Sequence, residues 1–473
     1  MNTMQTDVAV IGAGTAGLAA YRAANVAGAR VVLIEGDAYG TTCARVGCMP
    51  SKLLIAAAEA ADAVVQASGF GIHVDGCMRI DGREVMARVR RERDRFVGFV
   101  LSAVQDIPEA QRLRGHARFI DDHALIVDAH TRLTCKSIVI ATGAHAVQLD
   151  AYQCLGDRLI INDDVFNWHD LPNAVAVIGP GIIGLELGQA LHRLGVRVAV
   201  FGRGGRVGPL GDPAIRAYAI AAFNEEFTLL PDAHIANMQR DGERVVIQRT
   251  GAAGAQETEV FDYVLAATGR APNVAGIGLD QTTLELDAKG VPLFDPATAR
   301  TVSADRASPI FIAGDASNFI PLLHEAVDEG RIAGTNAAAL ALGQPVQPGL
   351  RRAPMGVVFT DPQIGIVGGG FRALEGVHFV TGQAGFEDQG RARVLRKNKG
   401  LLNVYGDAAS GRFLGAEMLA PAAEHLAHLL AWALQNEMTV AQMLEMPFYH
   451  PVIEEGLRTA LRDLNAKLRK ASP

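Results

Sequence analysis

The chain has 473 residues, of which 49% are hydrophobic and 20% charged, and a formal net charge of −7 at pH 7. This length exceeds what one hydrophobic core usually supports, so it predicts about two to four globular domains. The mildly acidic balance argues against a general surface for nucleic acid or for anionic membranes.

The beginning of the chain predicts a cytoplasmic protein. The residues MNTMQTDVAVIGAG enter an apolar strand at once and leave no room for the regions of a signal peptide. The most apolar long stretch, 174–201, contains charged side chains and glycines, so we do not expect it to span a membrane. In a reducing compartment, a close pair of cysteines indicates redox chemistry or metal binding rather than a structural disulfide.

Residues 7–35 predict a dinucleotide-binding βαβ unit. A buried-strand pattern leads into Gly12-x-Gly14-x-x-Gly17, an alanine-rich helix follows, and a second strand ends at Glu35. The glycines permit a tight turn and bring a pyrophosphate close to the N-terminus of the helix, and the acid can accept a hydrogen bond from a ribose hydroxyl.

The same pattern returns in residues 174–203, where a strand leads into Gly179, Gly181 and Gly184 and a second strand ends at Phe201. Two nucleotide sites in one chain imply two cofactors, one held tightly and one exchanging. An electron relay is the natural interpretation.

The second unit lacks the acid. The 23 positions that separate Gly12 from Glu35 lead from Gly179 to Gly202, which Arg203 follows. A carboxylate would repel the 2′-phosphate of NADP, whereas glycine and arginine leave room and positive charge for it. We therefore favour NADP, and NAD is the alternative if the arginine is only a solvated loop residue.

Two later strands, 137–144 and 263–273, each run into Ala-Thr-Gly. A glycine at the end of a strand indicates a tight turn or crossover of the chain. A third strand, 309–317, ends in Gly314-Asp315. Its acid can bind a ligand hydroxyl or cap the following helix, and the residues alone leave both interpretations open.

The pattern changes at about residue 350. Short strands such as those in MGVVFTDPQIGIVG, followed by amphipathic stretches, predict an antiparallel sheet with helices, which is a third domain. The last helix is expected to begin at Pro451. One earlier helix is expected to bury a face made by Leu426, Leu429, Leu430 and Leu434.

Cys43 and Cys48 lie five positions apart in the stretch GTTCARVGCMPSK, residues 40–52. In a regular helix their Cα atoms would be about 8.6 Å apart, and a disulfide spans at most about 7 Å. The two can join only if the backbone leaves the helix, which Gly47 makes easy. Pro50 suits the first turn of a helix with Cys48 at its N-terminal end, where the dipole favours a thiolate.

A zinc site is the competing use of this cysteine pair. It needs further ligands, and Cys77, Cys135 and Cys154 are scattered singly, so no metal site is predicted. We expect these three cysteines to be inert, buried small residues.

A second chemical candidate is His450 in the segment FYHPVIEEGL. The residue before a proline is pushed towards extended conformations, so His450 should project where the last helix begins. A carboxylate from Glu454 or Glu455 would orient the imidazole as a proton acceptor for a leaving thiol. A purely structural histidine is the alternative.

Together, these residues resemble the pyridine nucleotide-disulfide oxidoreductases of the lipoamide dehydrogenase and glutathione reductase group. The similarity spans nearly the whole chain in the family's motif order: CxxxxC after the first βαβ unit, ATG, GxGxxGxE, ATGR, the GD strand and HPxxxE. It implies an α/β fold with two Rossmann-like dinucleotide-binding domains, for FAD and NAD(P), and a C-terminal α+β dimerisation domain. The implied boundaries are 1–150 and 271–345 for the FAD-binding parts, 151–270 for the NAD(P)-binding domain and 346–473 for the dimerisation domain.

The resemblance also implies where the cofactors bind. Asp315 would hold the ribityl chain of FAD, and Lys52 would lie near the isoalloxazine and pair with Glu186. The other implied cofactor-binding residues are Gly12, Gly14, Gly17, Glu35, Thr142, Gly143, Gly179, Gly181, Gly184, Arg203 and Gly269.

The resemblance implies that Cys43 is the interchange thiol and that Cys48 faces the flavin. His450, oriented by Glu455, would be the acid/base supplied by the partner subunit, so a homodimer is required. Hydride would pass between nicotinamide and flavin, while thiol–disulfide exchange occurs at the cysteines. Two departures from the family's pattern are Thr41, where glycine is usual, and Arg45, which adds charge beside the pair.

We expect an enzyme most like dihydrolipoamide dehydrogenases, acting on a small dithiol or disulfide or on a lipoyl-bearing protein. Reduction of another small disulfide by NADPH, as in glutathione reductases, is the alternative, and a binding component of a multienzyme complex is a further one. Mercuric reductases are disfavoured because they need a cysteine pair near the C-terminus, and the last cysteine is Cys154. Soluble transhydrogenases of this fold are also disfavoured, because they lack the redox-active pair that Cys43 and Cys48 would form here.

Overall fold

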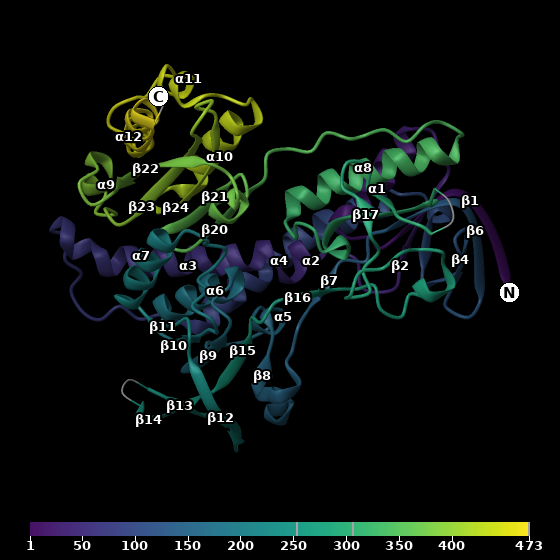
Figure 1. Ribbon diagram of the computed structural model, residues 1–473. Coiled ribbons are helices and arrows are strands. Elements are labelled where there is room, and N and C mark those ends of the chain that lie inside the picture. Colours follow the sequence, from purple (N-terminus) through teal and green to yellow (C-terminus); the bar gives the residue numbers. More distant parts are fainter. Residues whose placement is uncertain (252–253, 305–306, 472–473) are drawn as a thin grey trace. The chain divides into compact units, whose positions relative to one another are not determined.

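The computed structural model describes residues 1–251, 254–304 and 307–471 (Figure 1). Its contacts divide the chain into two compact units. The first contains Met1–Pro50, Val89–Val147 and Arg270–Arg351, and the second contains Ser51–Arg88, Gln148–Gly269 and Arg352–Pro473. The segment Ser51–Arg88, which the sequence placed with the FAD-binding part, therefore groups with the second unit.

The first unit is built on a nine-stranded sheet with parallel strands at its centre. β2 (Val31–Glu35) and β6 (Thr131–Ile140) flank β1 (Asn2–Ile11), and β19 (Ile310–Ile312) pairs with β6. The register aligns the carboxyl ends of these four strands, so the turns that follow them meet at one edge of the sheet. The smaller elements are α2 (Thr42–Val46), β3 (Arg112–Arg114), β4 (Ala117–Asp121), β5 (Ala124–Val127), β7 (Ala144–Ala146), β16 (Arg270–Pro272), β17 (Phe294–Asp295), β18 (Arg300–Thr301) and the 3-10 turn η6 (Gly314–Ser317).

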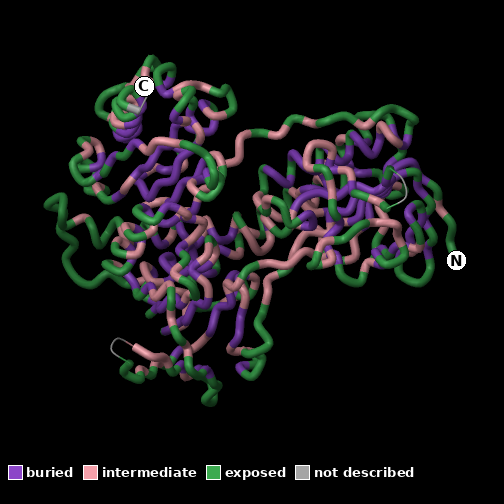
Figure 2. The backbone as a smooth tube through the Cα atoms, in the orientation of Figure 1, coloured by how far each residue is buried: buried purple, intermediate pink, exposed green. Residues whose placement is uncertain are grey.

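Two helices of the first unit, α1 (Thr15–Val26) and α8 (Leu323–Ala341), lie side by side (Figure 1). A Cβ atom on Gly330 would lie 2.2 Å from the Ala16 carbonyl oxygen, and one on Gly334 would lie 2.2 Å from that of Ala20. Only glycine permits so close an approach of the two backbones. Apolar residues of both helices and of the strands beneath them form one buried core (Figure 2).

The second unit contains the expected NAD(P)-binding fold. A parallel sheet has the order β11 (Thr228–Leu230), β10 (Arg197–Phe201), β9 (Ala174–Ile178), β15 (Tyr263–Ala266) and β8 (Leu159–Ile160). α6 (Ile182–Arg193) follows β9, as the glycine motif predicted. The unit also includes α4 (Gly82–Gln105, which continues into the first unit), α5 (Asn162–Val165), α7 (Pro213–Asn224) and an antiparallel sheet of β12 (His234–Asp241), β13 (Arg244–Thr250) and β14 (Gln256–Phe261).

One stretch, Thr42–Phe70, is long and apolar enough to span a membrane by length and composition alone. It contains α2 and α3 (Cys48–Gln66). The helical backbone is interrupted at Gly47, where φ is −122° and ψ is −117°. Lys52 within it forms an ion pair. An interrupted helix that carries a paired lysine is typical of a folded domain.

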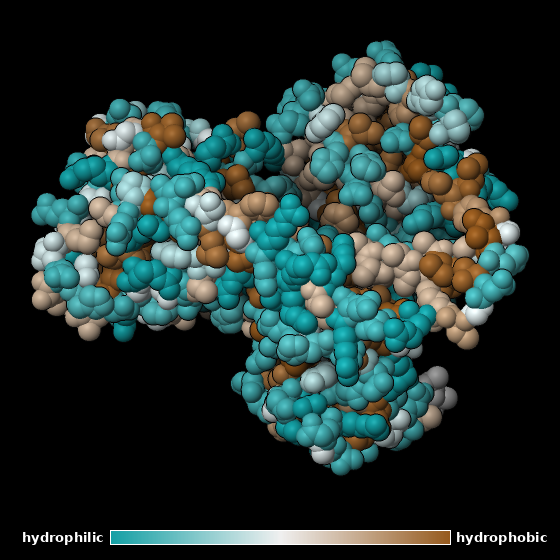
Figure 3. Space-filling view, turned by 180° about the vertical axis from the view of Figure 1, so that it is seen from behind, coloured by the Kyte–Doolittle hydropathy of each residue, from teal (hydrophilic) through white to brown (hydrophobic). Residues whose placement is uncertain are grey.

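The C-terminal part of the second unit is the predicted antiparallel sheet covered by helices. Its order is β20 (Met355–Val358), β21 (Gln363–Val367), β24 (Phe413–Ala420), β23 (Leu401–Asp407) and β22 (Phe379–Gly385). The helices are α9 (Gly390–Val394), α10 (Ala423–Gln435), α11 (Val440–Leu444) and α12 (Glu454–Ala471). Brown areas of hydrophobic side chains reach the surface of this part at the upper right of Figure 3. Such exposed apolar area suits a domain that binds another subunit.

Some expectations for this part were wrong. Leu426 and Leu430 of α10 are fully buried, but Leu429 is 41% exposed because it lies to one side of the buried stripe. The last helix begins at Glu454 rather than at Pro451, and before it the amide of Val452 is satisfied by the Glu455 side chain instead of by the helical backbone.

The single cysteines differ from one another. Cys135 is buried as predicted, and burial raises the pKa of its thiol to about 12. Cys77 and Cys154 are exposed, so the expectation of burial was wrong for both. Cys77 lies in an irregular segment after α3, and Cys154 lies in a turn whose buried side is formed by Leu155.

Candidate active site

The first glycine-rich turn lies between β1 and α1 and fits a dinucleotide. Gly12 has φ 104°, and a Cβ there would lie 2.3 Å from the Ala141 carbonyl oxygen. A Cβ on Gly17 would lie 1.8 Å from the carbonyl oxygen of Gly12, so both positions require glycine. Around Gly14 a Cβ would meet no described atom within 4 Å, which leaves the space that a pyrophosphate needs.

Two polar groups complete this cradle. The Glu35 carboxylate accepts hydrogen bonds from the amides of Ala13, at 2.8 Å, and Asp37, at 2.9 Å, which fix its position at the end of β2. The hydroxyl of Thr142, in the Ala-Thr-Gly turn after β6, is buried and has no hydrogen-bond partner in the described part of the chain. A buried hydroxyl without a partner beside the glycine turn fits a site completed by a bound ligand such as FAD.

Asp315 lies in η6, at the same edge of the sheet. Asp315 lies inside this turn, and the N-cap residue of the following helix α8 is Leu322, so Asp315 does not cap that helix. Burial raises the pKa of the Asp315 carboxyl group, and Arg270, whose Nε lies 4.0 Å from Oδ2, opposes this shift. Arg270 also donates to the carbonyl of Ala144. Asp315 therefore has an orienting cation and remains available to a ligand hydroxyl.

The cysteine stretch departs from a regular helix where the sequence predicted. α2 ends before Gly47, and α3 begins at Cys48. A Cβ on Gly47 would lie 3.2 Å from the Cα of Cys43 and 3.0 Å from the carbonyl oxygen of Thr42. The chain thus folds back onto Cys43 directly before Cys48. This close approach needs glycine.

Thr41, the departure from the family's glycine, has φ 59° and ψ 149°. This conformation is essentially reserved for glycine and costs other residues about 1–3 kcal/mol. Its hydroxyl accepts a hydrogen bond from the Ala44 amide at 3.2 Å and so caps α2. Arg45 donates to the carbonyl of Ala38 at 3.2 Å and packs against Gly40, so its charge is held on this loop.

The second glycine-rich turn repeats the geometry of the first. The amide of Gly12 donates to the Ile34 carbonyl at 2.8 Å, and the amide of Gly179 donates to the Phe201 carbonyl at 2.8 Å. The residues that follow these carbonyls, Glu35 and Gly202, are therefore equivalent, as the spacing predicted.

The glycines of the second turn have the same roles as those of the first. Cβ atoms on Gly179 and Gly184 would lie 2.3 Å and 2.0 Å from backbone oxygens, and one on Gly181 would meet no described atom within 4 Å. Gly143 and Gly269 adopt φ 71° and 116° in their Ala-Thr-Gly turns, and Arg203 is exposed. These positions fit a nucleotide at each turn.

Lys52 and Glu186 form the ion pair that the family resemblance implies. Nζ of Lys52 lies 2.7 Å from Oε2 of Glu186, which is 3% exposed. The amide of Phe359 donates to Oε1 of Glu186 at 2.9 Å, and Lys52 lies 4.7 Å from the centre of the Phe359 ring. The lysine is thereby fixed about one turn after Cys48 on the same helix.

His450 and Glu455 also lie together. Nδ1 of His450 is 3.0 Å from Oε2 of Glu455, and the imidazole is 79% exposed. The hydrogen bond from His450 lowers the pKa of the Glu455 carboxyl group, and the Val452 amide and Arg458 act in the same direction. An oriented and exposed imidazole can exchange a proton with a substrate.

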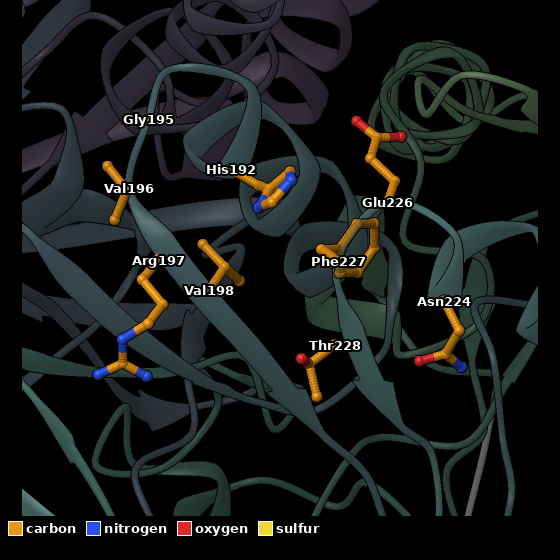
Figure 4. Close-up of a pocket in the computed structure, with 9 residues that line it drawn as sticks. All are labelled: His192, Gly195, Val196, Arg197, Val198, Asn224, Glu226, Phe227 and Thr228. Atoms are coloured by element: carbon orange, nitrogen blue, oxygen red, sulfur yellow. The ribbon is translucent and has the colours of Figure 1, made fainter.

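A cavity of about 470 Å³ lies elsewhere in the second unit (Figure 4). Arg197 and Thr228, the first residues of β10 and β11, line it together with His192 and Phe227. The glycine-rich turn follows the opposite end of the parallel strand β9. The cavity is therefore at the other edge of the sheet from the coenzyme turn.

Sequence reasoning missed Glu329 on α8, which is 1% exposed. Its Oε2 accepts from the Gly314 amide at 2.8 Å and from the Ser317 hydroxyl at 3.3 Å, and Oε1 accepts from Arg351 at 3.0 Å. Glu329 thus holds the turn that carries Asp315. The sequence signal was Glu329 in the stretch LLHEAVDEG, because a carboxylate on the buried face of a helix needs hydrogen-bond partners.

Comparisons with known proteins identify the family. The model of the pyridine nucleotide-disulphide oxidoreductase family matches residues 6–330, and that of the family's dimerisation domain matches residues 355–461. Mercuric reductase of Shigella flexneri is 30% identical over 478 residues, which cover 98% of this chain and 82% of that protein. Dihydrolipoyl dehydrogenase 3 of Pseudomonas aeruginosa is 29% identical over 488 residues, which cover 98% of each.

Among solved structures, LpdA from Mycobacterium tuberculosis matches with a TM-score of 0.82 at 25% identity, covering 97% of this chain and 99% of that chain. The fold is therefore two Rossmann-like domains with a dimerisation domain, as the sequence predicted. The chain belongs to the pyridine nucleotide-disulphide oxidoreductase family and is a flavin-dependent disulfide oxidoreductase that uses FAD and NAD(P).

Proposed function

We propose that the enzyme oxidises a dihydrolipoamide-like dithiol through Cys43 and Cys48 and transfers the electrons to NAD(P). The observation that carries this proposal is the break at Gly47, which folds the chain back onto Cys43 directly before Cys48. Overall, a dithiol and NAD(P)⁺ become a disulfide, NAD(P)H and a proton, so two electrons leave the two sulfurs. Bound FAD supplies the two-electron chemistry that links nicotinamide to thiols.

The two cysteines have different roles in this reaction. In the oxidised enzyme Cys43 and Cys48 form a disulfide, and a thiolate of the substrate attacks the Cys43 sulfur. A mixed disulfide with Cys43 forms, and Cys48, the cysteine nearer the flavin, leaves as a thiolate. The second substrate thiolate then displaces Cys43, so the substrate leaves as a disulfide and its two electrons remain on the two cysteines. The position of Cys48 at the N-terminus of α3 supports this assignment, because the helix dipole favours a thiolate there. Lys52, fixed by Glu186, places a positive charge on the same helix.

His450 of the partner subunit takes the proton of the attacking substrate thiol, and Glu455 orients its imidazole. The hydrogen bond between His450 and Glu455 and the exposure of the ring support this role. The dimerisation domain makes a homodimer the functional form. In the cytoplasm, a lipoyl group on a protein or a small dithiol would reach the cysteines.

The preferred coenzyme is NADP rather than NAD. At Gly202 a Cβ would lie 2.6 Å from the Pro231 carbonyl oxygen, so this position excludes the acid that would repel a 2′-phosphate. Arg203 follows it and is exposed to solvent. Missing carboxylate and available arginine both favour the phosphorylated coenzyme.

The alternative is NADPH-dependent reduction of another small disulfide. A pure binding role in a multienzyme complex would leave the paired Lys52 and Glu186 without a purpose. One relative is a mercuric reductase, but this chain has no cysteine after Cys154 for a C-terminal metal-binding pair.

The decisive experiment is steady-state turnover with dihydrolipoamide, lipoamide and glutathione disulfide, each with NAD(H) and NADP(H). The highest kcat/KM should belong to the lipoamide couple, and a higher value for glutathione disulfide would establish the alternative. Cys43→Ser should abolish disulfide turnover and leave flavin reduction by the nicotinamide coenzyme intact. Loss of flavin reduction in this variant would refute the division of labour.

A further inference from the structure

The loop after β10 is joined to the loop after β11 by backbone hydrogen bonds. The amide of Gly202 donates to the Leu230 carbonyl at 2.7 Å, that of Ala233 to the Gly202 carbonyl at 2.9 Å, and that of Gly205 to the Pro231 carbonyl at 3.0 Å. The end of β10 is where a Rossmann strand meets the adenosine ribose. Both loops therefore border the place of the coenzyme 2′ group.

A carboxylate reaches this border from the neighbouring loop. Oδ1 of Asp232 accepts a hydrogen bond from the Gly204 amide at 2.7 Å. Gly204 has φ 74° and lies two positions after Gly202. The charge that is missing at Gly202 is thus present on the adjacent loop, where sequence spacing within the βαβ unit does not reveal it.

We propose that Asp232 is a specificity-determining residue that weakens the binding of coenzymes carrying a 2′-phosphate. The proposal rests on the coenzyme position given under the proposed function. Asp232 acts in two ways: its charge repels the phosphate, and it occupies the Gly204 amide, a donor that a phosphate oxygen would otherwise use. A 2′-hydroxyl carries no charge, so Asp232 does not repel NAD.

Arg203 and Asp232 then act in opposite directions on one phosphate. Arg203 attracts the phosphate and favours NADP, whereas Asp232 repels the phosphate and weakens the binding of NADP. The preference for NADP over NAD in the wild type is therefore smaller than the missing acid at Gly202 alone would give. Removing the negative charge of Asp232 should therefore increase the preference for NADP over NAD.

The test uses the FAD-loaded dimer and two redox-inactive probes, 2′,5′-ADP and 5′-AMP, with dissociation constants from isothermal titration calorimetry. Asp232→Asn keeps an oxygen that can accept from the Gly204 amide and removes the charge. It should bind 2′,5′-ADP about tenfold more tightly than the wild type, with the constant for 5′-AMP unchanged. Asp232→Glu keeps the charge and should gain nothing.

Asp241→Asn is the matched control, because Asp241 is an exposed acid at the end of β12 in the same unit. It should change neither constant. Equal tightening of both probes in Asp232→Asn, or none, would overturn the proposal, because the effect would then not depend on the 2′-phosphate. Nucleotide binding needs no thiol chemistry, so failure of disulfide turnover would refute the proposed function and leave this result standing.

Discussion

The side chains of Lys52 and Glu186, 134 positions apart in the chain, form an ion pair of 2.7 Å. Glu186 lies on α6 of the nucleotide fold, and Lys52 lies on the helix that begins with Cys48. Phe359 contacts both members of the pair: its amide donates to Glu186, and its ring lies beneath the Lys52 ammonium group. The pair therefore joins the cysteine helix to the coenzyme-binding helix within the second unit.

Replacing Lys52 with methionine should destabilise the protein, because among the described residues the buried Glu186 carboxylate then keeps only the Phe359 amide as a hydrogen-bond partner. The free energy of unfolding should fall by about 1–3 kcal/mol, less than for a fully buried pair because the lysine side chain is 33% exposed. Urea unfolding of the FAD-loaded protein measures this. The double variant Lys52→Met, Glu186→Gln should lose less than the sum of the single losses, and strict additivity would show that the two groups are not coupled.

The sequence predicted those parts of the fold whose signals are local. Both βαβ units, the break at Gly47 and the antiparallel C-terminal sheet follow from glycine spacing and hydrophobic periodicity. The equivalence of Glu35 and Gly202 followed from one count of positions, and the backbone hydrogen bonds of the two turns agree with it.

The sequence could not predict contacts that depend on how distant segments pack. Asp232 lies in the loop after β11 and contacts the loop after β10, and Glu329 on α8 contacts the turn of Asp315. The side of α10 that is buried was misjudged at Leu429, since periodicity gives the width of a stripe only within a residue or so. The Lys52–Glu186 pair was available only through the family resemblance.

The pH dependence of stability should report the hydrogen bond between His450 and Glu455. The pKa of Glu455 is lowered in the folded protein, so its stabilising contribution is complete above the unfolded pKa of about 4.3 and is lost as the pH falls through the folded pKa. The advantage of the wild type over Glu455→Gln should therefore be constant near pH 6 and shrink below about pH 4.3. Urea unfolding at pH 6, 5, 4 and 3.5 tests this.

The comparison for that series is Glu454→Gln, which removes the neighbouring carboxylate from the same first turn of α12. Its stability relative to the wild type should show no comparable loss over this pH range. If the stability of the wild type relative to Glu455→Gln increased as the pH fell, the pKa of Glu455 would not be lowered in the folded protein.

At position 41 glycine should give a more stable protein than alanine, the reverse of the usual order inside a helix. Its φ of 59° and ψ of 149° strain any residue with a Cβ, and its hydroxyl caps α2. Both Thr41→Ala and Thr41→Gly lose the cap, but only the glycine variant also loses the strain. The glycine variant should therefore be more stable than the alanine variant by about 1 kcal/mol in urea unfolding.

Ala60→Gly, at an exposed position inside α3, calibrates that comparison. Glycine should be less stable than alanine there, by about 1 kcal/mol. If glycine were also the less stable residue at position 41, Thr41 would carry no backbone strain.

Glu329→Gln should weaken the binding of FAD, because Glu329 holds the turn of Asp315 through the Gly314 amide and the Ser317 hydroxyl. Loss of charge-assisted hydrogen bonds of this kind predicts a dissociation constant raised about tenfold or more, measured by the fluorescence of FAD titrated into apoprotein. The matched control is Glu325→Gln on the same helix, since Glu325 is equally buried and also binds Arg351, at 3.0 Å, but makes no hydrogen bond to the turn in the described structure. Its FAD affinity should stay near that of the wild type. Equal weakening in both variants would mean that the Arg351 ion pairs, and not the contacts with the turn, determine how tightly FAD is held.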